Sequence, residues 1–253
     1  MADWKLEPAR DLDLTEADRW ASLRRECGLV STALHLSAWA LIQTYLAFWH
    51  RLRIVGIENR PAEPPFILAA NHASHLDALV LGSALPWRLR DHVFPIAAGD
   101  VFFDSSLKSM FSAKFLNALP IWRKHCGPHA LQQLRRRLIE EPCVYILFPE
   151  GGRSRDGEMR PFKTGVGMLV AGTEVPVVPC HLSGTFQAMK PGSWLPRPER
   201  ITLRIAPAIR FNHLSNDRAG WSQAADSIQG QIELLGSAPA HGKIAYKATV
   251  TAA

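Results

Sequence analysis

The sequence predicts an α/β fold: a single domain with a mostly parallel β-sheet flanked by helices, preceded by an apolar N-terminal helix. Three observations predict it. Beyond residue 54, short β-rich runs alternate with helical stretches, as in chains that form parallel sheets. The 253 residues are 47% hydrophobic, which is enough to bury a sizeable core. Near the N-terminus, a run of 23 residues (27–49) contains no Asp, Glu, Lys or Arg.

The N-terminal run is long enough to cross a bilayer as a helix, but it also contains polar residues and has basic residues at both ends. Three interpretations stay open: a helix inserted into one leaflet, a full membrane span, and an ordinary buried helix. The residues before it are rich in Asp and Glu, unlike a secretory signal. We therefore expect the chain to remain on the cytoplasmic side.

The elements that follow are predicted from short apolar runs and helical periodicity, with the run at 144–148 the clearest buried strand. Pro176 and Pro179 should restrict the strand expected at residues 175–181 to a sheet edge or to an irregular strand end. We expect a membrane-associating segment over residues 1–50, the main domain over 51–236 and a flexible tail over 237–253. Strands are expected at residues 66–70, 93–97, 144–148, 175–181 and 201–205, and helices at residues 74–85, 107–119, 128–140 and 162–171.

Composition and charge exclude several classes of protein. The 18 prolines and 17 glycines follow no fixed period, which excludes a collagen-like chain. Lys and Arg outnumber Asp and Glu by 29 to 23, and the net charge of +6 suits phosphorylated metabolites, nucleic acid or an acidic membrane surface. No C-x-x-C pair is present, so we expect four free thiols. These are Cys27, Cys126, Cys143 and Cys180.

The first candidate site follows the strand at 66–70 and contains Asn71, His72, His75 and Asp77. The carboxylate of Asp77 can hold one nitrogen of His72 and leave the other nitrogen free to remove a proton. Two alternatives remain at this point. Ser74 and Asp77 also fit a helix capping box, and the two histidines with Asp77 could bind a metal, although no further ligand spacing supports one.

The second candidate site follows the strand at 144–148 and reads Glu150, Gly151, Gly152 and Arg153, with Arg160 and Lys163 further on. Glycines allow close approach of the backbone to a ligand, and arginines suit phosphate oxygens. This pattern predicts an anion cradle, although a tight turn would also explain the glycines. A Walker loop is absent. Arg123 is a further cation, at the end of an apolar run.

Taken in order, these segments resemble the glycerolipid acyltransferase family, in particular the 1-acyl-sn-glycerol-3-phosphate acyltransferases. The family motif N-H-x(4)-D is met by Asn71, His72 and Asp77, F-P-E-G-T-R-S by residues 148–154, and V-P-[IV]-[VI]-P by residues 175–179. The resemblance covers about residues 50–212.

There are two departures from the family pattern. Gly152 replaces the usual Thr of the third motif. The second motif, G-x-x-F-x-x-R, keeps Arg123 but has Asn117 and Pro120 at its glycine and aromatic positions. Because that motif is associated with acceptor binding, the identity of the acceptor stays open.

The resemblance implies an acyltransferase of phospholipid biosynthesis. A fatty acyl group would pass from acyl-CoA or acyl-carrier protein to the hydroxyl of a lysophospholipid, in first place 1-acyl-sn-glycerol-3-phosphate (lysophosphatidic acid), giving phosphatidic acid. His72 would be the general base, and Asp77 would orient it. Arg153, with Arg123 and Lys163, would hold the acceptor phosphate. Glu150 would shape the cradle. The N–H groups of Gly151 and Gly152 would stabilise the oxyanion.

The same resemblance implies membrane lipids as partners, no cofactor beyond the acyl donor, no metal, and a place at the cytoplasmic face of the cell membrane. Two alternatives remain: an acyltransferase for another lysolipid, including lyso-aminolipids, and a non-catalytic lipid-binding protein of the membrane. A nucleic-acid partner is not expected, because no recognition motif or aromatic stacking platform is present. The absence of G-x-S-x-G argues against a serine hydrolase.

Overall fold

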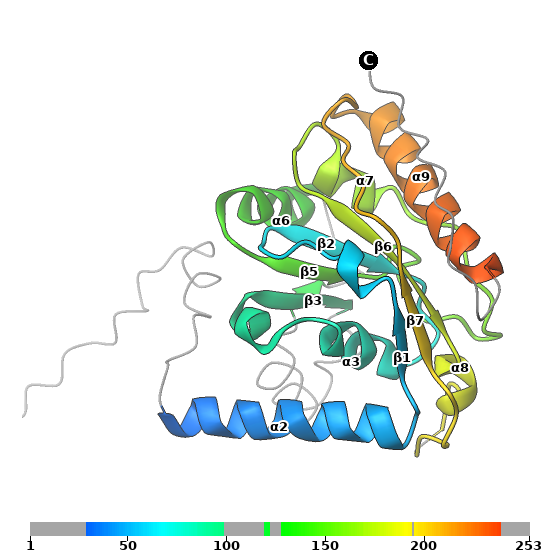
Figure 1. The fold of residues 1–253 in the computed structure, drawn as a ribbon. Coiled ribbons are helices and arrows are strands. Elements are labelled where there is room, and N and C mark those ends of the chain that lie inside the picture. The colour runs from blue at the N-terminus through cyan, green and yellow to red at the C-terminus, as the bar shows by residue number, and fades with distance from the viewer. Residues whose placement is uncertain (1–28, 99–118, 122–127, 194, 239–253) are drawn as a thin grey trace, which may run out of the picture.

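Figure 1 shows the computed structural model of the chain, which describes residues 29–98, 119–121, 128–193 and 195–238. Seven strands form one sheet in the order β1-β7-β6-β2-β5-β3-β4. All neighbouring strands are parallel except β6 and β7, which are antiparallel. The strands are β1 (Arg53–Val55), β2 (Phe66–Ala70), β3 (Val93–Ala98), β4 (Leu119–Ile121), β5 (Val144–Leu147), β6 (Val177–Ser183) and β7 (Thr202–Ile205).

Helices cover both faces of the sheet, which gives three layers (Figure 1). On one face α3 packs on the sheet and α2 packs on α3; on the other face lie α6, α7 and α9. The helices are α2 (Leu29–Phe48), α3 (Leu76–Ser83), α6 (Pro128–Glu140), α7 (Gly165–Val170), α8 (Thr185–Ala188) and α9 (Arg218–Ser237), with 3₁₀ turns η1 (Ile57–Asn59) and η2 (Trp87–His92).

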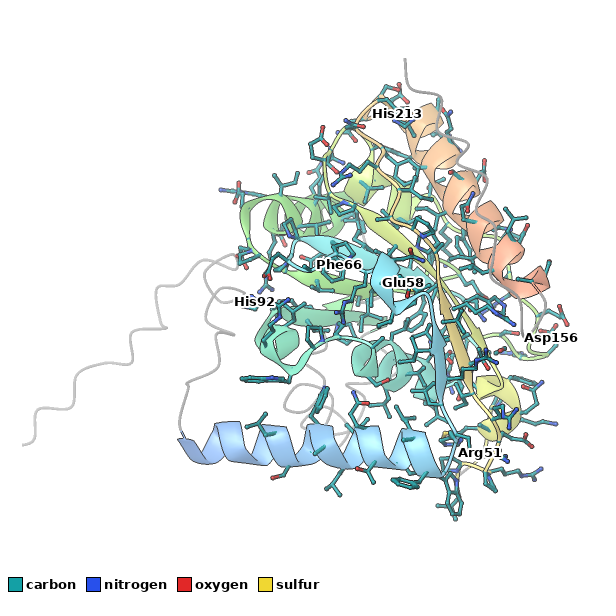
Figure 2. The ribbon with its side chains drawn as sticks, viewed as in Figure 1. Arg51, Glu58, Phe66, His92, Asp156 and His213 are labelled. Atoms are coloured by element: carbon teal, nitrogen blue, oxygen red, sulfur yellow. The ribbon has the colours of Figure 1, made fainter. Side chains whose placement is uncertain are left out.

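Strand β2 shows why the apolar runs of this sequence are continuous rather than alternating. Phe66, Leu68 and Ala70 face the layer of α2 and α3, whereas Ile67 and Ala69 face the layer of α6, α7 and α9. All five side chains are at most 1% exposed, and Figure 2 shows Phe66 in the interior of the molecule. A strand covered on both faces needs apolar residues at every position, as in other parallel sheets.

The predicted mostly parallel α/β sheet is confirmed, with strands at each of the five predicted places. Strand β2 and helix α6 have the predicted bounds. Of the helix expected at 107–119, residues 107–118 lie outside the described part of the chain, and Leu119 belongs to strand β4. No prediction covered strands β1 and β4 or helices α8 and α9; α9 has 20 residues, and its N-cap is Asp217.

For the strand expected at residues 175–181, the prediction of a sheet edge is wrong, whereas that of an irregular strand end agrees with the structure: β6 begins after Pro176, and its pairing with β7 begins after Pro179. Strand β6 is central, between β7 and β2. Pro179 pairs with Ala69 of β2, and its carbonyl accepts a hydrogen bond from Ala206 N (2.9 Å), just beyond the end of β7. Pairing between β6 and β7 extends only from Cys180 onward. Pro179 lies outside the β6–β7 pairing, so the N–H that it lacks removes no hydrogen bond from that pairing.

Two helices are shorter than predicted because residues before them are used elsewhere. Helix α3 begins at Leu76 rather than at residue 74. Helix α7 begins at Gly165 rather than at residue 162. The N–H of Phe162 donates to Gln229 of α9 (2.9 Å), and the N–H of Lys163 donates to the carbonyl of Pro149 (2.9 Å). These bonds fix the approach to α7 against the candidate anion cradle.

Helix α2 is docked on the domain along one side. Leu46 is fully buried, and Gln43 donates to the carbonyl of Ser83 at the end of α3 (2.7 Å). His50 is also fully buried, and its Nε2 lies 2.9 Å from the hydroxyl oxygen of Tyr45. In the part of the chain that the structure describes, no helix has the length and hydropathy needed to span a membrane.

Two of the four expected free thiols can be placed. Cys143 and Cys180 are both free and buried, and burial raises the pKa of Cys143 to about 11. Burial raises the pKa of Cys180 as well. Cys27 and Cys126 lie outside the described residues. A buried, protonated thiol behaves as a small apolar side chain, so Cys143 and Cys180 are part of the core.

Candidate active site

The candidate site lies at the carboxyl ends of β2 and β5, which are neighbours in the sheet. In open α/β sheets this edge is where ligands bind. Asn71, the first residue after β2, fixes the start of the loop: its side chain donates to the carbonyl of Leu182 (3.0 Å) and accepts from the N–H of Leu182 (2.8 Å). This pair of bonds ties the end of β2 to β6.

His72 and Asp77 form the hydrogen bond that their spacing predicts. Nδ1 of His72 lies 2.8 Å from Oδ2 of Asp77, whose side chain is fully buried, whereas that of His72 is 15% exposed. An ionised carboxylate can only accept, so Nδ1 carries the proton and Nε2 is left with its lone pair. This arrangement suits a general base.

Asp77 also organises the loop before α3. Its Oδ2 accepts hydrogen bonds from the backbone N–H groups of Ala73 and Ser74, each at 2.7 Å. The other oxygen, Oδ1, is buried and has no hydrogen-bond partner among the described residues. The capping interpretation is thus partly met, because the carboxylate reaches the N–H of Ser74, but the same oxygen holds the imidazole of His72.

Three residues that follow β5 contact His72. The ring of Phe148 stacks on the imidazole, with centroids 4.0 Å apart and planes 15° apart. Oε1 of Glu150 accepts the backbone N–H of His72 (2.7 Å), and the N–H of Ser154 donates to the carbonyl of His72 (2.8 Å). The base and the candidate cradle are therefore one connected unit.

Glu150 is the buried link between these two segments. Its Oε2 accepts the backbone N–H of Arg160 (3.2 Å) and lies 3.7 Å from Nε of the same arginine. Burial raises the pKa of Glu150, and the N–H donors of His72 and Arg160 oppose that shift. A carboxyl with two backbone donors and a nearby guanidinium is built to hold the main chain in place.

The candidate cradle at Gly151 and Gly152 is a turn with a glycine in the left-handed conformation. Gly151 has φ +71°, a conformation that side chains disfavour, and a Cβ there would lie 2.6 Å from Nζ of Lys163. Lys163 therefore lies over the turn. The expectation that both glycines supply oxyanion donors is wrong for Gly151, whose N–H donates to Phe148 O (3.0 Å). No described residue accepts from the N–H of Gly152.

The structure brings together seven of the eight expected site residues. Arg123 lies outside the described residues. Within the described part of the chain, no group of three or more His, Cys, Asp or Glu side chains is placed to hold a metal ion. The residues brought together are His72, Asp77, Glu150, Gly151, Gly152, Arg153 and Lys163.

A cavity of about 350 Å³ lies between the loop that follows β2 and helix α9. Asn71 and Ala73 line it, but His72 does not, and its described lining contains two carboxylates and neither Lys nor Arg. His181 lines the cavity, and its buried Nδ1 has no hydrogen-bond partner in the part of the chain that the structure describes. Burial, followed by the charge of Arg204, lowers the pKa of His181 to about 4. The cavity is therefore distinct from the anion cradle.

The sequence motifs assign no separate role to two residues that touch the site. Phe148 was part of a recognised motif, but its stacking on His72 joins residues from different strands and has no local signal. Arg160 was noted only as a nearby cation, although it contacts Glu150 and the carbonyls of Gly152 and Arg153. Of the apolar residues after Lys163, Val166, Leu169 and Val170 belong to the core.

The fold and the site together define an α/β protein with a candidate general base beside an anion cradle. Residues 51–183, just over half of the chain, match the model of the family described as Acyltransferase, and the chain belongs to this family.

Curated relatives agree with this assignment. A 1-acyl-sn-glycerol-3-phosphate acyltransferase from Limnanthes douglasii is 28% identical over 167 residues, 66% of this chain and 57% of the relative. The alpha form of an enzyme with the same name from Mus musculus is 27% identical over 183 residues, 71% of this chain and 61% of the relative. The matched part of this chain thus spans less than two thirds of either relative.

A solved structure shows the same fold. The crystal structure of a 1-acyl-sn-glycerophosphate (LPA) acyltransferase from Thermotoga maritima matches with a TM-score of 0.60 and 21% sequence identity, and the match covers 88% of both chains.

Proposed function

We propose that this protein transfers a fatty acyl group from acyl-CoA or acyl-carrier protein to the free hydroxyl of a lysophospholipid, with 1-acyl-sn-glycerol-3-phosphate as the acceptor and phosphatidic acid as the product. The observation that carries the proposal is the 2.8 Å bond between His72 and the buried Asp77, next to the cradle at 150–153. The names of the curated relatives support the same acceptor.

In this mechanism His72 acts twice. Nε2 takes the proton of the acceptor hydroxyl as the oxygen attacks the thioester carbonyl, and Asp77 stabilises the imidazolium that forms. When the C–S bond breaks, the leaving thiolate recovers that proton from His72. An ester bond replaces the thioester bond, and no covalent acyl-enzyme is needed. The N–H of Gly152 is the candidate donor to the tetrahedral oxyanion.

The acceptor phosphate would lie against the cradle. Lys163 lies over Gly151, and Arg153 belongs to the same turn, so two cationic residues are close to the backbone that would receive a phosphate. Arg123 is a third proposed ligand, on the basis of the family motif. No metal or redox cofactor takes part in the proposed steps.

Helix α2 would hold the site at the membrane surface, where both amphiphilic substrates reside. Leu41 and Phe48 are 69% and 82% exposed, lie seven residues apart on one side of α2, and face away from the buried Leu46; Trp49 is 48% exposed beside them. An apolar, exposed helix side suits insertion into one leaflet. We propose that the protein is associated with the cytoplasmic face of the cell membrane in this way.

Replacement of both Leu41 and Phe48 by Glu should reduce binding to phosphatidylglycerol-containing vesicles at least tenfold in a flotation assay, because each charge would have to enter the acyl region. Leu234→Glu is the matched control, since Leu234 is 63% exposed on α9, across the sheet. Unchanged binding of the double variant would contradict the proposed membrane face.

The test of the function is thioester-dependent acylation of a panel of lysolipids in detergent micelles, with free thiol and lipid product followed together. We expect phosphatidic acid from lysophosphatidic acid with the wild type, and none above background with His72→Ala. Turnover only with another lysolipid would keep the mechanism and change the acceptor. No transfer to any lysolipid from either donor would overturn the proposal and favour a lipid-binding protein.

A further inference from the structure

Arg160 makes contacts that no resemblance to known motifs assigns. From a segment beyond the turn, its Nη2 donates to the carbonyls of Gly152 and Arg153, the latter at 2.7 Å. Its Nε lies 3.7 Å from Oε2 of Glu150, and its backbone N–H donates to the same oxygen at 3.2 Å. One residue thus contacts the turn and the buried carboxylate that holds His72.

These contacts set the direction of the backbone donors of the cradle. In a trans peptide, the carbonyl of one residue and the N–H of the next point in opposite directions. The carbonyls of Gly152 and Arg153 both point to Nη2 of Arg160, so the N–H groups of Arg153 and Ser154 point to the other side. The bond from Ser154 N to the carbonyl of His72 (2.8 Å) agrees with this direction. The two N–H groups therefore face the side of the base.

The same contacts remove an obstacle to anion binding. Carbonyl oxygens that face a phosphate would repel it, whereas those of Gly152 and Arg153 are engaged by a guanidinium. Gly152 has no side chain, so this part of the turn is held only through its backbone and its neighbours. A planar guanidinium can engage two carbonyls and a carboxylate at once, which the single ammonium of lysine does less well.

We propose that Arg160 is a positioning residue that fixes the backbone of the anion cradle, so that the turn at residues 152–154 holds the side chain of Arg153 where it receives the phosphate of the acceptor. The proposal rests on the proposed function for its reaction, but it concerns phosphate binding. Arg160 need not touch the substrate: its side chain is 48% exposed and engaged with the main chain of the turn.

The first experiment compares wild type, Arg160→Gln and Arg160→Lys with two acceptors, lysophosphatidic acid and monoacylglycerol, which lacks the phosphate. We expect Arg160→Gln to raise KM for lysophosphatidic acid about tenfold and to change kcat/KM for monoacylglycerol less than twofold. Arg160→Lys should fall between. Arg136→Gln is the matched control, because Arg136 is exposed and pairs with Glu140 of α6, away from the site. A purely structural role would lower kcat/KM for both acceptors alike.

The second experiment separates this inference from the proposed function, because it does not need turnover. Inorganic phosphate should raise the unfolding temperature of the wild type and of Arg136→Gln, and should raise that of Arg160→Gln by less than half as much. Equal shifts in Arg160→Gln and wild type would overturn the inference even if the wild type is an active acyltransferase. A reduced shift would support it even if no lysolipid is acylated.

Discussion

The two halves of the candidate site are built in different ways. The base after β2 is a local structure: His72 and Asp77 are five residues apart, and Asp77 organises the loop between them. The cradle after β5 is held by contacts between distant segments, from Glu150 to His72 across 78 residues and from Arg160 to the turn. The comparison teaches that a short motif can specify the candidate base by itself, whereas the candidate cradle forms only in the assembled fold.

The largest effect is expected from a change in the local half. In Asp77→Asn, the amide NH₂ would either face the donor Nδ1 of His72 or occupy the buried place of Oδ1, where no described residue offers a partner. The imidazole would lose its charged partner, and we expect kcat to fall about 10³- to 10⁴-fold. Steady-state kinetics with lysophosphatidic acid would measure this. A fall of less than tenfold would show that Asp77 mainly caps the loop.

A change at Glu150, which links the two halves, should have a smaller effect on kcat but should also affect KM and stability. Glu150→Gln keeps the shape of the side chain but leaves one acceptor oxygen for the two N–H groups of His72 and Arg160. We expect about 1–3 kcal/mol of lost stability, together with lower kcat and higher KM. Urea unfolding and kinetics on the same preparation would test it. An effect on KM alone would mean that Glu150 serves only the cradle.

His181, whose Nδ1 is buried, and the exposed His213 allow a test that depends on pH. His181 has a folded-state pKa of about 4, below its unfolded value near 6.5, so the unfolded state binds more protons between these values. The stability that this neutral histidine contributes is present above pH 6.5 and is lost as the pH falls toward 4. From pH 7 to pH 5 we expect a loss of about 2 kcal/mol.

His181→Gln should remove that pH-dependent loss in chemical unfolding at the two pH values. His213→Gln, which changes an exposed histidine, should leave the loss as it is in the wild type; Figure 2 shows His213 at the surface. An equal loss of stability in wild type and His181→Gln would mean that protonation of His181 does not control acid stability.

The smallest effect is expected from the turn of the cradle. Gly151→Ala places a side chain at φ +71° and against Lys163, so we expect about 1–2 kcal/mol of lost stability and a KM for lysophosphatidic acid raised a few-fold. Gly82→Ala, in helix α3, is the control, because a Cβ there meets nothing within 4 Å and alanine favours helices. A Gly151→Ala variant as stable as Gly82→Ala would contradict the described turn.

The sequence allowed prediction of those features that depend on near neighbours. The buried strands, the length of α6 and the pairing of His72 with Asp77 follow from local patterns. The central place of β6 could not be predicted, because it depends on where β7 ends. The contacts of Phe148 and Arg160 arise only when β2 and β5 lie side by side, so no spacing in the sequence indicates them.

The most direct measurement of the central claim is the ratio of kcat/KM for lysophosphatidic acid to that for monoacylglycerol, in wild type, Asp77→Asn and Arg160→Gln. If the local half supplies the base and the assembled half holds the phosphate, Asp77→Asn will lower both values and leave the ratio within about twofold of wild type. Arg160→Gln will lower the ratio about tenfold. A wild-type ratio near one, or a ratio that falls in Asp77→Asn and not in Arg160→Gln, would contradict this division between the two halves.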